Sequence, residues 1–236
     1  MISLLQLFDK MKKITSAILS FFLVLFLSSA AEAQSQLVID DFNSGQTTFQ
    51  FGAGVSTTPT TGGSILGGQR VDSVVVPSLS GSEFFGTLGF NGDLVLSQGS
   101  SDEIIAGLNY NSLGGTDLTN GGIYQNFLLD FTSLDDSTVP LTNVLNLSVS
   151  SGGTTVSQNV TIPDQNSATE VLVNFSNFSN VDLTAVDSVE LEFDFTGNPG
   201  RDLQLGSFSV TSVPEPGSLV VLSCALSAML LRRRRR

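Results

Sequence analysis

The sequence predicts an all-β protein, an antiparallel β-sandwich of jelly-roll type. Runs rich in Val, Ile, Leu, Phe and Thr recur along residues 34–212, and Gly, Asn, Asp or Ser bounds each of them. Some runs alternate strictly: in Ser188–Phe195, four apolar residues share one face and Glu190, Glu192 and Asp194 share the other. About ten to twelve such strands, without a fixed-period repeat, favour two packed sheets.

The predicted strands share this composition and are separated by turn residues. In chain order they are Leu37–Phe42, Thr47–Gly52, Arg70–Val76, Phe84–Phe90, Asp93–Ser97, Glu103–Tyr110, Ile123–Phe131, Leu141–Ser150, Thr154–Ile162, Thr169–Phe175, Ser188–Phe195 and Leu203–Thr211.

The segments between these strands carry their own signals. Ser150–Gly153 joins two strand runs through a Gly-Gly pair and predicts a hairpin turn. The alternation of the last run changes phase near Gly206, which predicts a bulge there. Residues 56–63 are rich in Thr, Gly and Pro and predict a loop, whereas residues 133–137 and 181–186 are the candidates for helical turns.

Charge and composition exclude several classes of function. Arg70 and Arg201 are the two basic residues of 34–212, against 19 of the 22 acidic ones, so this body carries a net charge of about −17. Such a charge excludes nucleic acid as a partner. The chain has no histidine, and its one cysteine is Cys224, outside the body, so histidine triads, cysteine nucleophiles and His/Cys zinc sites are excluded.

The N-terminal segment, residues 1–33, has the order of a secretory signal peptide. A basic start at Met11–Lys13, the natural start being either Met1 or Met11, precedes an apolar stretch that runs to Leu27. Ala31 and Ala33 then form an Ala-x-Ala cleavage site before Gln34. We therefore expect export through the Sec translocon and removal of this segment by signal peptidase.

The C-terminal segment, residues 213–236, has three parts in fixed order. Val213, Pro214, Glu215 and Pro216 form a rigid turn, and an apolar run from Gly217 to Leu231 follows, which is short for a transmembrane helix. The basic cluster that ends the chain places its C-terminus in the cytoplasm by the positive-inside rule; it consists of Arg232, Arg233, Arg234, Arg235 and Arg236.

This three-part tail resembles the PEP-CTERM sorting signal of Gram-negative bacteria. The resemblance implies that a membrane-embedded exosortase recognises the tail and cleaves near Pro214–Pro216. The protein would then be anchored transiently in the inner membrane before its release to the cell surface or extracellular matrix. The body 34–212 forms the single domain between the two processed ends.

A second resemblance concerns the body. Leu37–Phe42, Gly67–Arg70, Phe178–Leu183, Val186–Leu191 and Asp202–Leu205 are similar to segments of jelly-roll modules related to galactose-binding and carbohydrate-binding domains. In those folds the final strand pairs near the first. The resemblance implies the same architecture here.

Several residues of the body are candidates for a site. Asp40 and Asp41 on the first strand could bind calcium with Asp202 if the first and last strands are neighbours. Tyr110 and Tyr124 lie in the segments richest in aromatic and amide side chains, which suit a sugar ligand. Arg70 and Arg201 each lie near an acid and favour ion pairs. We expect no catalytic residues and no cofactor other than this calcium.

Three functions remain open at this point. The first is a non-catalytic surface or matrix protein associated with exopolysaccharide. The second is a carbohydrate-binding module, with or without calcium. The third is a hydrolase that attacks glycans with carboxylates alone, for which 19 acidic residues offer many pairs and no specific one.

Overall fold

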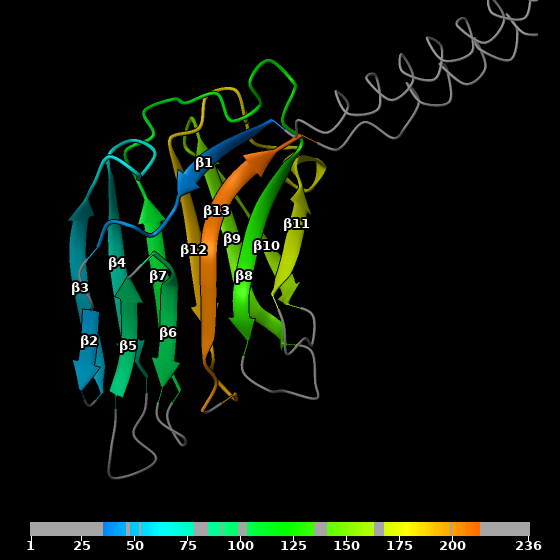
Figure 1. Cartoon of the computed structure of the whole chain (residues 1–236). Coiled ribbons are helices and arrows are strands. Elements are labelled where there is room, and N and C mark those ends of the chain that lie inside the picture. Colours follow the sequence, from blue (N-terminus) through cyan, green and yellow to red (C-terminus); the bar gives the residue numbers. More distant parts are fainter. Residues whose placement is uncertain are drawn as a thin grey trace, which may run out of the picture. The chain divides into compact units, whose positions relative to one another are not determined.

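The computed structural model describes residues 35–45, 48–51, 53–77, 85–90, 92–98, 103–134, 141–162, 168–198 and 200–212. They belong to one compact unit that runs from Ser35 to Ser212. Within it, antiparallel strands form two sheets that lie as two layers (Figure 1). The predicted β-sandwich is therefore confirmed.

The first sheet has seven strands. Six follow the order β11-β8-β13-β6-β5-β2, and β1 pairs with β13. Their bounds are β1 Gln36–Asp40, β2 Thr48–Phe51, β5 Phe85–Phe90, β6 Leu94–Gln98, β8 Asn126–Leu134, β11 Thr169–Asn174 and β13 Leu203–Thr211.

The second sheet has six strands in the order β10-β9-β12-β7-β4-β3. Their bounds are β3 Gly54–Thr61, β4 Gln69–Val76, β7 Ile105–Tyr110, β9 Leu141–Ser151, β10 Thr154–Ile162 and β12 Ser188–Asp194. A 3-10 helix, η1, covers Phe175–Phe178 between β11 and β12.

The alternating pattern of the sequence produces the core between the sheets. On β12, Val189, Leu191 and Phe193 are fully buried, whereas Glu192 on the other face is exposed. Leu191 lies opposite Leu108 of β7 and Leu147 of β9, which are also fully buried. Each such side chain contributes roughly 1.5–3 kcal/mol when it leaves water. All twelve predicted strands are present, with ends displaced by a few residues at most.

The prediction of a loop at residues 56–63 is wrong, because most of this segment belongs to strand β3. This strand lies at the edge of the second sheet, where it pairs with β4 along its length. Pro59 lies opposite Val71. A proline has no N–H group to donate, which an edge strand tolerates on its unpaired side.

The helical turns expected at residues 133–137 and 181–186 are not found where the structure describes these residues. Residues 181–186 form turns that end in a bridge between Val186 and Thr116, and the helical turn lies instead at η1. Ser133 belongs to β8, while residues 135–137 lie outside the described part of the chain.

The predicted hairpin and bulge are both confirmed. Gly152 and Gly153, with φ of 56° and 80°, turn β9 into β10 in a left-handed conformation that favours glycine. The register between β13 and β8 shifts on both sides of Leu205, so that Gly206 is an extra residue. A Cβ atom at Gly206 would lie 2.7 Å from the methyl group of Thr132, which only glycine avoids.

None of the helices among the described residues is long and apolar enough to span a membrane. The residues of the expected signal peptide and of the expected sorting tail lie outside the described ranges.

Candidate functional site

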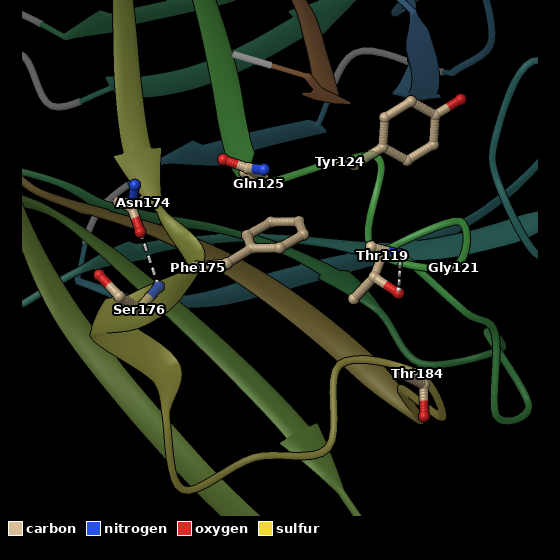
Figure 2. Close-up of a pocket in the computed structure, with 9 residues that line it drawn as sticks. Thr119, Gly121, Tyr124, Gln125, Asn174, Phe175, Ser176 and Thr184 are labelled. Carbon is tan, nitrogen blue, oxygen red and sulfur yellow. Dashed lines mark hydrogen bonds between the residues drawn. The ribbon is translucent and has the colours of Figure 1, made fainter.

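An open depression of about 520 Å³ lies at one end of the sandwich, where three segments between residues 119 and 184 meet (Figure 2). We call it the Tyr124 depression, after the predicted ligand residue that lines it. Its lining residues come from the loop before β8, from the end of β11 with η1, and from the loop before β12. They are Thr119, Gly121, Gly122, Tyr124, Gln125, Asn174, Phe175, Ser176 and Thr184.

The loop before β8 is held by the side chain of Asp117. One carboxylate oxygen accepts hydrogen bonds from the Thr119 backbone N–H at 2.7 Å and the Thr119 hydroxyl at 2.6 Å, and the other accepts from the Gly121 N–H at 3.1 Å. These bonds, the Thr119 hydroxyl above all, lower the pKa of Asp117. Asn120 and Gly121 both have positive φ, 46° and 66°, which asparagine and glycine adopt most readily.

The opposite wall is built around Asn174 and Phe175. Asn174 caps η1, because its Oδ1 accepts a hydrogen bond from the Ser176 N–H at 2.8 Å. The Phe175 N–H donates to the carbonyl of Gln125 at 2.8 Å, and its ring packs edge-on against Phe127 with centroids 4.9 Å apart. Figure 2 shows the Phe175 ring between the two walls, with Thr119 on one side and Asn174 on the other.

The third segment of the rim carries a second carboxylate. Asp182 accepts hydrogen bonds from the N–H and the hydroxyl of Thr184, at 2.9 and 2.6 Å. These bonds lower the pKa of Asp182, the hydroxyl most, and the nearby carboxylate of Asp117 opposes the effect. Both carboxylates are therefore ionised at neutral pH, and the rim of the depression is negative.

The chemistry of the depression suits an uncharged, polar ligand with an apolar face. The edge of the largely buried Phe175 ring lines it, and the amides of Asn174 and Gln125 and the hydroxyl of Ser176 lie on one side of this ring (Figure 2). The amide nitrogen of Asn174 and the side chain of Gln125 donate no hydrogen bond to any residue that the structure describes, so both can donate to a ligand. Proteins bind sugars and similar molecules through aromatic rings that have such polar groups beside them.

Tyr110 does not belong to this site, which corrects the prediction that it binds a ligand. It is fully buried, and its hydroxyl donates to Asp40 Oδ2 at 3.1 Å. Burial raises the pKa of Tyr110 well above its usual value. The alternating pattern of β7 directs Tyr110 into the core, whereas Tyr124 lies in a loop just before β8.

Tyr110 is instead part of a buried ionic network around Arg70. The guanidinium donates to Asp40 and, through Nε at 2.5 Å, to Asp72, and all three side chains are fully buried. Asp72 also accepts from the Thr60 hydroxyl at 2.6 Å. We call these five residues the Arg70 network. It links β1 of the first sheet to β3, β4 and β7 of the second.

The electrostatics of the Arg70 network reflect its burial. Burial raises the pKa of Asp40, although the positive charge of Arg70 and the hydrogen bond from the Phe42 N–H oppose this effect. Arg70 Nη2 also donates to the carbonyl of Ser44 at 2.9 Å, and the guanidinium lies 5.8 Å from the centre of the Phe42 ring. The ion pair expected between Arg70 and a neighbouring acid is therefore present, with a second acid that the sequence did not indicate.

The three aspartates expected to bind calcium do not form a common site. β1 and β13 are neighbours, as the calcium hypothesis required, but Asp40 lies opposite Phe208. Asp202 is six residues before Phe208 and accepts from the Gln98 N–H at 3.2 Å. Asp41 accepts from the Asn43 N–H at 3.1 Å. Within the described residues, no group of three acidic side chains could hold a metal ion.

Sequence reasoning found one wall of the depression and missed the other. The sequence predicts Tyr124 as a ligand residue, whereas it places Asn174 and Phe175 at the end of the predicted strand Thr169–Phe175. The available signal was Asn174 itself, because an asparagine at the end of a strand run is typical of a helix N-cap. That signal predicts the helical turn η1, but it does not predict that η1 lies beside the loop before β8.

Comparison with known proteins does not show a family for this chain. No family model matches the chain, and no curated protein matches it either. Among solved structures, a family 11 carbohydrate-binding module from Clostridium thermocellum, in complex with a β-1,3-1,4-mixed-linked tetrasaccharide, is 15% identical with a TM-score of 0.38. The alignment covers 78% of this chain and 98% of that module.

Two further structures show similar values. The CBM22-1 xylan-binding domain of Paenibacillus barcinonensis Xyn10C is 13% identical with a TM-score of 0.34, and the alignment covers 78% of this chain and 98% of that domain. The agarase AgWH50C is 14% identical with a TM-score of 0.42, over 77% of this chain. The chain spans 25% of the length of that agarase.

Proposed function

We propose that this chain is an exported, non-catalytic carbohydrate-binding protein whose jelly-roll body binds an uncharged saccharide in the Tyr124 depression. The observation that carries the proposal is a depression lined by the edges of two largely buried rings, Phe175 and Tyr124, beside the exposed amide groups of Asn174 and Gln125. A sugar ring has apolar C–H faces and hydroxyl groups at its edge, so it can contact the exposed edge of an aromatic ring and accept hydrogen bonds from amides.

The charge of the site supports an uncharged ligand. Asp117 and Asp182 are both ionised at the rim, and the body as a whole carries about −17. A uronate or a sulfated sugar would be repelled by these charges. A neutral polysaccharide, or an uncharged end of a polysaccharide that carries charges elsewhere, is not repelled by these carboxylates.

The two ends of the chain support export and sorting to the place where such a ligand occurs. The signal peptide, residues 1–33, directs the body out of the cytoplasm and is removed after Ala33, and the Pro-Glu-Pro turn, apolar run and arginines retain the body briefly at the membrane. An exosortase-type enzyme then releases it to the cell surface or matrix. Replacing Glu215, or deleting 232–236, should change the location and mass of the mature protein; unchanged location and mass would contradict the sorting proposal.

The binding proposal is tested with the substitution Asn174→Asp. An aspartate keeps the oxygen that caps η1, so the body should stay folded, but it removes the amide donor and adds a negative charge. We expect binding to the producing organism's own exopolysaccharide to weaken at least about tenfold, or roughly 1.4 kcal/mol. Titration calorimetry with purified 34–212, with and without calcium, measures it.

The matched control is Asn177→Asp, which makes the same change of charge outside the depression. Asn177 is exposed, and its carbonyl accepts a hydrogen bond from Gln158. We expect this variant to bind as the wild type does. If the wild-type body binds and Asn174→Asp binds equally well, the ligand lies elsewhere; if the wild type binds no polysaccharide in either condition, the chain is a matrix protein with another partner.

A further inference from the structure

The edge strand β10 is regular and carries none of the residues that usually protect a sheet edge. β10 and β3 are the two edges of the second sheet, on opposite sides of the sandwich (Figure 1). Within the described ranges β10 has one strand neighbour, β9, and its register with β9 is unbroken from Thr154 to Val160. The sequence of β10 contains no charged residue, proline or glycine. Proteins commonly place such residues on an edge to prevent pairing with another chain.

The turn before β10 fixes which of its backbone groups face outward. A two-residue turn is flanked by a hydrogen-bonded pair, here Ser151 with Thr154, and bonded and non-bonded pairs alternate from that point along the ladder. Thr155 and Ser157 therefore direct their N–H and C=O groups away from β9. Both residues are exposed. The edge thus presents backbone donors and acceptors in the spacing of a strand.

The outer face of the β9–β10 hairpin is a row of paired hydroxyl groups. The hydroxyl oxygens of Ser148 and Ser157 are 2.7 Å apart, and so are those of Ser150 and Thr155. A hydroxyl group donates one hydrogen bond and accepts two, so each pair has capacity for a further hydroxyl partner. A second, antiparallel copy of β10 supplies that partner when Thr155 of one copy lies opposite Ser157 of the other. The edge is therefore complementary to itself.

Charge and sequence favour this edge over the other ends of the two sheets. The body carries about −17, so two copies repel each other wherever their carboxylates meet. β11 carries Glu170, and β2 is only 4 residues long. β3 is uncharged, but Pro59 removes a donor from its unpaired side. β10 is the edge at which a second copy meets backbone donors and acceptors without a like charge.

We propose that two copies of this chain pair through antiparallel β10 strands, so that their six-stranded sheets become one continuous sheet across a twofold axis. Such a contact uses the same edge of both copies, so it closes after two copies. Pairing of a few residues buries less area than a standard interface, and the dimer should therefore be weak, with a Kd of roughly 10–500 μM. Under the proposed function a dimer carries two Tyr124 depressions and holds a repeating polysaccharide at two points.

The substitution Ser157→Asp tests the pairing. In the dimer it brings two new carboxylates together near the twofold axis, where like charges oppose each other across the strands. The matched control is Thr57→Asp, which makes the same change of charge at an exposed position of β3, the opposite edge of the same sheet. We expect the Kd of the dimer to rise at least about tenfold for Ser157→Asp and to change less than about twofold for Thr57→Asp.

Sedimentation velocity of 34–212, the unit that holds every described strand, measures the Kd at roughly 5–1000 μM protein. Salt gives an independent readout, because screening of the negative bodies should strengthen the wild-type dimer between about 50 and 500 mM. Ser157→Pro removes the outward-facing N–H group without adding a charge and should weaken the dimer at both salt concentrations. Thermal melts confirm that each variant is folded.

Two results would overturn the proposal. One is a wild type that stays monomeric at every concentration and at both salt concentrations. The other is a dimer that Ser157→Asp and Thr57→Asp weaken equally, since its contact would then lie elsewhere. Species larger than a dimer would also contradict it, because two copies use up both β10 edges.

The dimer and the proposed function fail separately, since the sedimentation experiment contains no saccharide. If 34–212 dimerises through Ser157 and binds no polysaccharide, this proposal holds and the proposed function fails. If 34–212 stays monomeric and binds polysaccharide in a manner that Asn174→Asp weakens, the dimer proposal fails and the proposed function holds.

Discussion

Replacing Arg70 with methionine removes the cation of the Arg70 network and leaves Asp40 and Asp72 buried without it. All three side chains are fully buried in the native protein. Removing one partner of a buried ion pair costs roughly 3–5 kcal/mol, because the remaining charge is uncompensated. For a domain of this size that loss lowers the melting temperature by roughly 6–20 °C.

The dependence of this loss on pH follows from the sign of the Asp40 shift. Burial raises the folded-state pKa of Asp40 above its unfolded value of 3.8, so the native state binds the proton more tightly. The stability contributed by this carboxyl is present below the unfolded pKa and is lost as the pH rises through the folded pKa. Removing Arg70 takes away the charge that limits the shift, so the stability of Arg70→Met should rise as the pH falls from 7 towards 4, relative to the wild type.

Urea unfolding of 34–212 between pH 4 and 7 measures both effects. The triple variant Asp40→Asn, Arg70→Met, Asp72→Asn is the control, because it removes every charge of the Arg70 network while nearly conserving volume; we expect it to recover most of the lost stability at pH 7. Arg201→Met, at a half-buried position, should cost about 1 kcal/mol or less. A loss under about 1 kcal/mol for Arg70→Met, with an unchanged pH profile, would refute the reasoning.

Three further predictions concern the core, a turn and a sheet face. Phe127→Ala should cost about 3–5 kcal/mol in urea unfolding, because its fully buried ring packs against three others, among them Phe175; a cost near zero would contradict this packing. Gly153→Ala should lower the free energy of unfolding by about 1–2 kcal/mol in the same assay, since the φ of Gly153, 80°, is left-handed. An unchanged urea midpoint would contradict a left-handed conformation at this turn. Burial and the Glu192 charge raise the pKa of Glu190, so its carboxylate lowers stability as the pH rises. Glu190→Gln should stabilise by a few tenths of a kcal/mol at pH 7 and not at pH 4, a modest effect because the group is partly solvated, and thermal melts at the two pH values measure it.

Much of the fold follows from local sequence patterns. Leu191 and Phe193 alternate with acids, which fixes the face of β12 that is buried whatever its neighbours are. The Gly152-Gly153 pair and the phase change at Gly206 likewise act within a few residues. The one strand that was missed, β3, contains Pro59, which signals a loop unless the strand is known to lie at an edge.

The candidate site was predictable only in part, because its walls are far apart in the chain. Tyr124 and Asn174 are fifty residues apart and meet because β11 pairs with β8, with Asn174 opposite Asn126. Tyr110 and Tyr124 look alike in the sequence, as aromatic residues among amides. Both are buried, but Tyr110 lies within the Arg70 network and Tyr124 lines the depression, and this difference depends on the strands and loops that enclose each of them.

The sequence by itself determined the all-β class, the positions of twelve strands, the hairpin turn, the bulge and the strongly negative charge of the body. Each of these depends on residues that are close together in the chain, so a pattern over a few positions is enough to indicate it. The tertiary structure alone decided that the first and last strands bring Ser35 beside Ser212, that Arg70 holds two buried aspartates, and that Phe175 and Tyr124 line one depression. These features arise from pairing between distant strands, and alternation shows that a face is buried without showing what covers it.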